Sequence, residues 1–239
     1  MNPCQDGHDP GLTIAGITKL STCDWPGRLA ATIFLQGCPW RCGYCHNPGL
    51  QACYISGLVE WGDVLSLLDQ RRGLLDAVVF SGGEPTRQPG LTQAIEQVRA
   101  KGFVIGLHTA GIYPGLLAKV VALVDWVGLD IKALPSRYES ITGVGSSASR
   151  AYKSLEIVVE SGVDHEVRIT VDPTVHDEDH ILSLVRNLQD RGVSSIVVQE
   201  VRALGTTDTY ALTMAGRRLN DVLSRTPEGV LIRQDRLSS

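Results

Sequence analysis

Short apolar runs alternate with longer amphipathic stretches along most of this 239-residue chain. Continuous runs of strand-forming residues, without polar alternation, are typical of strands covered on both faces. Because strands separated by helices form βαβ units, the pattern predicts an α/β fold with a parallel sheet. Six such units can form a partial barrel or an open doubly wound sheet. The expected strands are Ala30–Leu35, Ala77–Phe80, Phe103–Leu107, Trp126–Leu129, Val167–Val171 and Ile196–Val198.

Apolar residues spaced three and four apart predict the helices between these strands. Ahead of them, Pro26-Gly27 suits the centre of a type II turn, because proline presets φ and glycine accepts a positive φ. We therefore expect a leading extended segment, Thr13–Leu20, that turns back into the first core strand. The expected helices are Trp61–Gln70, Leu91–Val98, Pro114–Leu123, Arg150–Glu160, Ile181–Leu188 and Thr209–Ser224.

Polar residues follow each of the six predicted strands. The carboxyl ends of parallel strands share one face of an α/β fold, where binding sites are built. We therefore expect the polar residues at these ends to lie close together. In strand order they are Cys38, Ser81–Pro85, His108-Thr109, Asp130 with Lys132, Arg168 with Asp172, and Glu200 with Arg202.

All six cysteines lie in the first quarter of the chain, and none follows Cys53. A disulfide framework is expected in a small secreted chain, whereas thiols bunched in a long chain more often serve metal binding or catalysis. Cys38, Cys42 and Cys45 form a C-x3-C-x2-C pattern directly after a strand. They could bind a structural zinc ion with His46 or Cys53 as fourth ligand, or an iron–sulfur cube with one open iron, or they could be packed thiols. We expect the other three, Cys4, Cys23 and Cys53, to be free thiols.

This cysteine pattern, with an aromatic residue just before its last cysteine, resembles the signature of the radical S-adenosylmethionine family. The longer strings Phe34–Cys38 and Tyr44–Pro48 resemble the glycyl-radical-enzyme activases. Within these, Asp24–Arg28 and the chain length resemble the activating proteins of anaerobic ribonucleoside-triphosphate reductase. The resemblance runs from about Thr13 to about Arg202.

The resemblance implies a partial (β/α)6 TIM-like barrel with a leading N-terminal extended segment. It also implies a single domain over residues 1–239 with a core at about 13–202; we expect residues 1–10 to be disordered. Cys38, Cys42 and Cys45 would bind a 4Fe-4S cluster whose fourth iron chelates S-adenosylmethionine. Reductive cleavage would give a 5′-deoxyadenosyl radical that abstracts hydrogen from a glycine of the reductase, which is oxidoreductase chemistry carried by the cofactor.

Further candidate residues for binding S-adenosylmethionine come from the same resemblance. Gly82-Gly83-Glu84 matches a strand end that receives the methionine ammonium, with Glu84 adding negative charge. His108 stands where many relatives have a cation-binding aspartate, so we expect a neutral, hydrogen-bonded histidine there. Structural ion pairs are the alternative for Lys132 and Arg168, and Arg202 aligns only loosely with a family histidine. The other candidates at this site are Tyr44, Asp130, Lys132, Arg168 and Arg202.

Composition limits the partners. The chain has 22 Lys and Arg against 26 Asp and Glu, a net charge of −4, which argues against nucleic-acid binding. No stretch approaches the ~20 apolar residues of a membrane span, and the N-terminus has no export signal, so we expect a soluble cytoplasmic protein. We also expect His165, His176 and His180 to face solvent.

The resemblance implies two partners, a glycyl radical enzyme and a flavodoxin or ferredoxin electron donor. Three alternatives remain open at this point. The chain could activate another glycyl radical enzyme of the pyruvate formate-lyase type, or act on a small molecule. It could also be a zinc-binding protein without catalysis, although that would leave Gly82–Glu84, Lys132 and Arg168 as coincidences.

Overall fold

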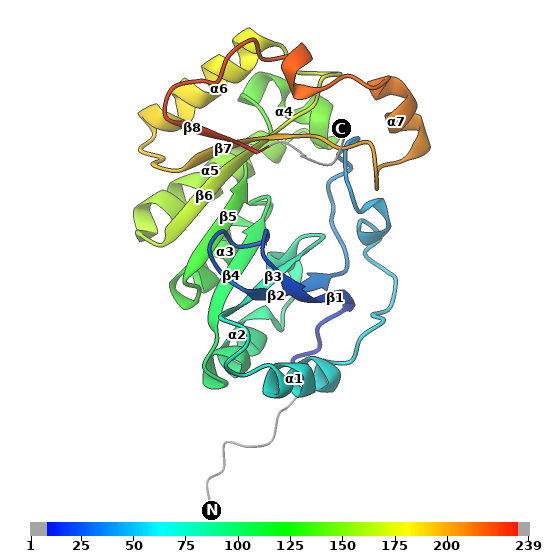
Figure 1. Ribbon diagram of the computed structural model, residues 1–239, viewed down its shortest axis with the longest axis vertical. Coiled ribbons are helices and arrows are strands. Elements are labelled where there is room, and N and C mark those ends of the chain that lie inside the picture. Colours follow the sequence, from blue (N-terminus) through cyan, green and yellow to red (C-terminus); the bar gives the residue numbers. More distant parts are fainter. Residues whose placement is uncertain (1–8, 234–239) are drawn as a thin grey trace, which may run out of the picture.

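The computed structural model describes residues 9–233, which form a sheet of eight strands in chain order. The first strand, β1, pairs antiparallel with β2, and every later strand is parallel to the one before it. Figure 1 shows the sheet curving from β1 to β8 with helices on its outer side. The strands are β1 (Ile14–Ser21), β2 (Ala30–Leu35), β3 (Ala77–Gly82), β4 (Val104–Thr109), β5 (Trp126–Asp130), β6 (Asp164–Val171), β7 (Ile196–Glu200) and β8 (Val230–Arg233).

The helices cover the sheet with their apolar faces. On α2, for example, the predicted stripe of Leu91, Ala94, Ile95 and Val98 is buried in the main core. Within residues 9–233 no helix combines the length and apolarity needed to cross a bilayer. The helices are α1 (Trp61–Gln70), α2 (Leu91–Ala100), α3 (Pro114–Val120), α4 (Pro135–Thr142), α5 (Ser147–Ser161), α6 (Glu178–Asp190) and α7 (Asp208–Met214), with short 3-10 turns at Pro48–Leu50, Pro85–Arg87, Val121–Leu123 and Leu219–Asp221.

The predicted fold class is confirmed. All six predicted core strands appear as the parallel strands β2–β7, and the leading segment is β1. A curved sheet in chain order with helices outside is the partial TIM-like barrel that the family resemblance implies, one of the two architectures that the strand pattern left open.

The connection from β1 to β2 fills the inside of this partial barrel. Gly27 has φ +78, and the Arg28 N–H donates to the Trp25 carbonyl at 3.1 Å, as the predicted turn requires. The turn brings Trp25 onto Trp126 of β5, where the rings stack at 5.3 Å. A Cβ on Gly106 of β4 would lie 2.9 Å from the Trp25 ring, so only glycine leaves room for it. The leading hairpin therefore plugs the barrel below the carboxyl ends of its strands.

Two elements are absent from the sequence prediction, and one predicted helix is too long. Neither α4 nor the four-residue β8 has a pattern long enough to stand out from the sequence. The helix predicted over 209–224 ends at Met214, because Ala215 and Gly216 take positive φ values of 52 and 74. Residues 1–8 of the segment expected to be disordered lie outside the described residues, whereas Pro10 is buried against Gly90.

Candidate cofactor-binding site

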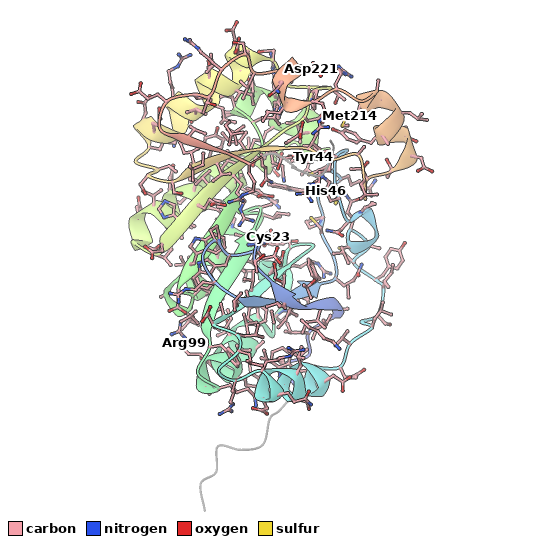
Figure 2. All side chains as sticks on the ribbon, in the orientation of Figure 1. Cys23, Tyr44, His46, Arg99, Met214 and Asp221 are labelled. Atoms are coloured by element: carbon pink, nitrogen blue, oxygen red, sulfur yellow. The ribbon has the colours of Figure 1, made fainter. Side chains whose placement is uncertain are left out.

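A cavity of about 220 Å³ opens at the carboxyl ends of the strands. Residues near the carboxyl ends of β3–β7 line it, and on β6 the two lining residues, Arg168 and Thr170, are two positions apart, as expected for side chains on one face of a strand. Figure 2 shows Tyr44 and His46, both from the loop after β2, near the middle of the molecule. Of the twelve predicted site residues, ten line the cavity: Cys38, Cys42, Tyr44, Cys45, Gly82, Gly83, His108, Asp130, Lys132 and Arg168.

The loop Gly37–Pro48, which we call the cysteine loop, is pinned at both ends by hydrogen bonds. The Gln36 side-chain amide donates to the carbonyls of Gly49 and Ala52 at 2.9 and 2.8 Å. The Cys38 N–H donates to Gln51 at 3.1 Å. These bonds return the chain to the strand end after the loop and hold the three thiols at the mouth of the barrel.

The two glycines after β3 allow this strand end to touch the cysteine loop. Gly82 has φ +110, and a Cβ on Gly83 would lie 2.5 Å from the Gly37 carbonyl oxygen. That same carbonyl accepts the Glu84 N–H at 3.0 Å. The Gly-Gly pair thus serves a close main-chain approach beside Cys38, in addition to lining the cavity.

Glu84 does not line the cavity. Its side chain is fully buried, and one carboxylate oxygen accepts the Thr86 N–H, the Thr86 hydroxyl and the Thr109 hydroxyl. The other oxygen accepts the Ala110 N–H at 3.0 Å. Burial raises the pKa of this carboxyl, and the four hydrogen bonds oppose that rise. Glu84 therefore ties the end of β3 to the end of β4.

The cysteine loop has donor groups that suit an iron–sulfur cluster. Burial raises the pKa of Cys38 to about 12, although the Trp40 backbone N–H acts to lower it. Burial also raises the pKa of Cys42. Both are thus protonated until a cation replaces the protons. The Trp40 indole N–H and the Tyr44 hydroxyl are buried without a partner among the described residues. Soft thiolates surrounded by spare donors fit a sulfur-rich anionic cofactor.

The zinc alternative lacks a converging ligand set. Between residues 9 and 233, no group of three or more His, Cys, Asp or Glu side chains is arranged around a position for a single metal ion. His46 Nε2 already accepts the Arg202 N–H at 3.2 Å, and Cys23 and Cys53 are exposed free thiols.

Across the cavity, Lys132 supplies a buried positive charge. Its ammonium lies 3.4 Å from Asp130 Oδ2 and 5.4 Å from the centre of the Tyr44 ring. Burial alone would lower the pKa of Lys132, but the neighbouring Tyr44, Cys42 and Asp130 raise it well above its ordinary value. The lysine is therefore a cation, suited to an anionic group in the cavity.

Four buried side chains hold the main chain around Lys132. The Lys132 N–H donates to the Tyr138 hydroxyl at 3.3 Å, and its carbonyl accepts from His176 Nε2 at 3.0 Å. The Tyr152 hydroxyl donates to the Ala133 carbonyl, and His180 Nε2 accepts the Leu134 N–H. The segment after β5 is thus rigid although it belongs to no helix or strand.

The expectation that His176 and His180 face solvent is wrong. Both are buried and stacked at 5.4 Å. Burial lowers the pKa of His176 to about 4, so its ring is neutral. Its Nδ1 accepts the Asp172 N–H while Nε2 donates to Lys132. Two main-chain partners account for the burial of a residue type that sequence alone places on the surface. His165 is half-buried.

His108 and Arg168 form the floor of the cavity. His108 Nε2 donates to the Asp24 carbonyl at 2.6 Å, and Nδ1 pairs with the Ser81 hydroxyl at 3.1 Å. Burial, together with Arg168, lowers the pKa of His108 to about 4, which makes it neutral. A Cβ on Gly128 would lie 2.9 Å from the Arg168 guanidinium carbon, so this glycine makes room for the floor.

Arg168 has an ionic partner outside the cavity. Its Nε lies 2.8 Å from Glu166, and Arg233 of β8 contacts the other oxygen of the same carboxylate at 3.1 Å. The guanidinium of Arg168 also lies 5.2 Å from the centre of the Trp126 ring. Arg168 therefore both forms an ion pair with Glu166 and lines the floor of the cavity.

The remaining predicted residue, Arg202, is exposed and approaches the site through its backbone N–H to His46. Sequence reasoning missed several other residues that line the cavity. Gln199 donates to the Thr170 hydroxyl at 2.7 Å. It sits at the end of β7, where the strand-end rule could have found it. Ser81 and Thr109 belong to the strand ends expected to lie close together, and Trp40 and His46 belong to the cysteine loop. The lining residues that were missed are Asn47, Gln51, Ala110, Thr170 and Gln199.

Comparison with known proteins agrees with this geometry. Residues 32–205 match the model of the radical SAM superfamily. A protein of Methanocaldococcus jannaschii, provisionally named as a glycyl-radical enzyme activating enzyme, is 30% identical over 185 residues, 74% of this chain and 75% of that protein. The pyruvate formate-lyase-activating enzyme of Clostridium pasteurianum is 28% identical over 202 residues, 80% of this chain and 83% of the relative.

A solved structure shares the fold. SuiB of Streptococcus suis, bound to S-adenosylmethionine, superposes with a TM-score of 0.57 at 17% identity, over 84% of this chain and 48% of SuiB. The chain therefore spans about half the length of that protein. Given the match over residues 32–205, the chain belongs to the radical SAM superfamily, whose cofactors are a 4Fe-4S cluster and S-adenosylmethionine.

Proposed function

We propose that this protein is the activating enzyme of a glycyl radical enzyme, and that its client is anaerobic ribonucleoside-triphosphate reductase. One observation carries the proposal: three thiols of one loop, a Gly-Gly strand end and a buried ammonium line a single cavity. When bound, the reduced cluster and S-adenosylmethionine supply a 5′-deoxyadenosyl radical that removes a hydrogen atom from the substrate. The class is supported by the relatives named as activating enzymes.

In this proposal the protein residues bind and orient the cofactors. Cys38, Cys42 and Cys45 hold the cluster, and the main chain of Gly82 and Gly83 accepts the ammonium of S-adenosylmethionine. Lys132 attracts its carboxylate, for which a charge-assisted hydrogen bond is worth about 1.5–3 kcal/mol. Two cationic side chains line the cavity, Lys132 and Arg168. Each already pairs with a carboxylate of the protein, so both are positioned before any ligand binds.

The ring of Tyr44, a residue of the cysteine loop, lies beside the ammonium of Lys132 and lines the cavity. His108 is a neutral part of the floor, which argues for a positioning role in place of cation binding. We assign Glu84 and Arg202 to the frame of the site, since neither lines the cavity.

The client assignment is supported by the sequence. Asp24–Arg28 and the chain length resemble the activating proteins of the anaerobic reductase. We further propose that the whole chain acts as one radical SAM domain and that a flavodoxin or ferredoxin reduces the cluster.

The first experiment tests the class. The protein is purified without oxygen, reconstituted with iron and sulfide, and given S-adenosylmethionine and dithionite. We expect 5′-deoxyadenosine as the product. Bound zinc with no 5′-deoxyadenosine would rule out radical chemistry altogether.

The second experiment tests the client. The reconstituted protein is incubated with anaerobic ribonucleoside-triphosphate reductase or with pyruvate formate-lyase, and the glycyl radical is quantified by electron paramagnetic resonance. A signal only on the reductase supports the client assignment, and one only on the lyase overturns it. Cleavage without a radical on either protein would favour a small-molecule substrate.

A further inference from the structure

An indole N–H lies buried without a partner inside the cysteine loop. Trp40 is 1% exposed, and its Nε1 has no hydrogen-bond partner among the described residues. Leaving such a buried donor unpaired destabilises the fold. Trp61 shows the ordinary arrangement, since its Nε1 donates to Gln97 Oε1 at 2.6 Å. The exception at Trp40 therefore points to an acceptor that residues 9–233 do not provide.

Trp40 lies in the cysteine loop, beside the three thiols. It stands between Cys38 and Cys42 in the loop and lines the same cavity as Cys38, Cys42 and Cys45. Its backbone N–H lowers the pKa of the Cys38 thiol, against the larger effect of burial. One residue thus has a main-chain donor at a thiol and a side-chain donor without an acceptor beside it.

The ring of Trp40 is held in place by packing. It meets Tyr138 edge-on, with centroids 5.7 Å apart and planes at 72°. Tyr138 in turn accepts the Lys132 N–H and packs edge-on against Tyr152. These contacts fix the orientation of the indole, and the three rings are buried.

We propose that the Trp40 indole N–H donates a hydrogen bond to a sulfur of the 4Fe-4S cluster and thereby raises the reduction potential of the cluster. Hydrogen bonds to cluster or cysteinyl sulfur stabilise the more negative, reduced state, and they are a main means by which a protein sets this potential. Trp40 is thus a positioning and tuning residue. The proposal rests on the cofactor and does not depend on which client the protein activates.

The direct test is spectroscopic. The protein is produced with tryptophan labelled by ¹⁵N in the indole ring, reconstituted, and reduced. Pulsed electron paramagnetic resonance then measures ¹⁵N couplings to the cluster. We expect a ¹⁵N coupling in the unaltered protein, its loss in Trp40→Phe, and its retention in Trp61→Phe. Absence of the coupling from the unaltered protein, or its survival in Trp40→Phe, overturns the proposal.

A second test separates the hydrogen bond from the shape of the ring. Benzothienylalanine at position 40 keeps the bicyclic shape and replaces the N–H by sulfur, so packing against Tyr138 is preserved. We expect the reduction potential to shift to more negative values with this residue and with Trp40→Phe, and to stay unchanged in Trp61→Phe. An unchanged potential with benzothienylalanine shows that the N–H does not reach the cluster and ends the proposal, even if Trp40→Phe does not fold.

Discussion

The two walls of the cavity are built in different ways. The first wall, formed by the cysteine loop and the end of β3, is held by main-chain contacts such as the Glu84 N–H to the Gly37 carbonyl. The second wall, around Lys132 after β5, is held by side chains from α4, α5 and α6 and the loop before α6, including His176 and His180.

This difference decides what a change in each wall does. A main-chain contact at glycine tolerates no side chain, so the first wall is sensitive to added volume. A wall held by buried histidines is sensitive to protonation, because a neutral ring that donates and accepts cannot accept a second proton without losing a bond. The predictions below test this comparison.

The largest effect is expected in the cysteine loop itself. Cys42→Ala removes a half-buried thiol that lines the cavity. We expect iron binding and 5′-deoxyadenosine formation to fall to background, while cooperative unfolding persists because the core is apolar. Iron content, product assay and thermal unfolding check this. Cys53→Ala, at an exposed free thiol, is the matched control and should behave as the unaltered protein.

The next effect concerns added volume in the first wall. In Gly83→Ala the new Cβ would lie 2.5 Å from the Gly37 oxygen and 2.9 Å from the Leu50 oxygen, both rigid main-chain atoms. We expect the free energy of unfolding to drop by about 3 kcal/mol, measured by urea denaturation. Gly62→Ala in the first turn of α1 meets no atom within 4 Å and should raise it by about 0.5–1 kcal/mol. Equal stabilities for the two variants would contradict the close approach.

The second wall should respond to acid. The pKa of His176 is about 4 in the fold, against 6.5 ordinarily, so between these values the unfolded chain binds a proton that the folded chain does not. The neutral His176 ring therefore contributes fully to the free energy of unfolding above pH 6.5. This contribution, at most about 3 kcal/mol, is lost as the pH falls towards 4. Asp172, Arg137 and His180 surround this ring.

Urea denaturation across this pH range checks the acid response. In His176→Gln the fall in the free energy of unfolding should be shallower than in the unaltered protein. The difference between the two proteins should then shrink as the pH is lowered. A constant difference from pH 7 to 4 would mean that His176 does not titrate in this way.

The smallest effect is expected at the ion pair between Arg233 and Glu166. Arg233→Ala removes one partner of Glu166, but the Arg233 side chain is 36% exposed and Arg168 keeps its bond to Glu166. We expect a loss of below about 1 kcal/mol in the free energy of unfolding. Arg72→Ala, from an exposed pair with Asp69, should change it less still. A loss larger than that of Gly83→Ala would show that the cavity floor at Arg168 depends on β8.

Sequence reasoning reached most of the fold because its signals are local. The α1 boundaries and the six core strands follow from periodicity and apolar runs of ordinary length. It failed at β8, whose four half-exposed residues have no buried pattern, and after Met214, where Ala215 takes a positive φ that its residue type does not signal. In the site, Glu84 matched a motif, but its carboxylate is used up by Thr86, Thr109 and Ala110.

The six core strands and the chemistry at their carboxyl ends are thus determined by the amino-acid sequence, because residue type and spacing suffice to specify them, whereas the order of the strands in one curved sheet is seen only in the tertiary structure. Only the tertiary structure decided how His176 and His180 support the segment after Lys132, and that the Trp40 N–H finds no acceptor within residues 9–233. Such contacts join residues far apart in the chain, and whether a polar atom finds a partner depends on where every neighbouring side chain comes to rest.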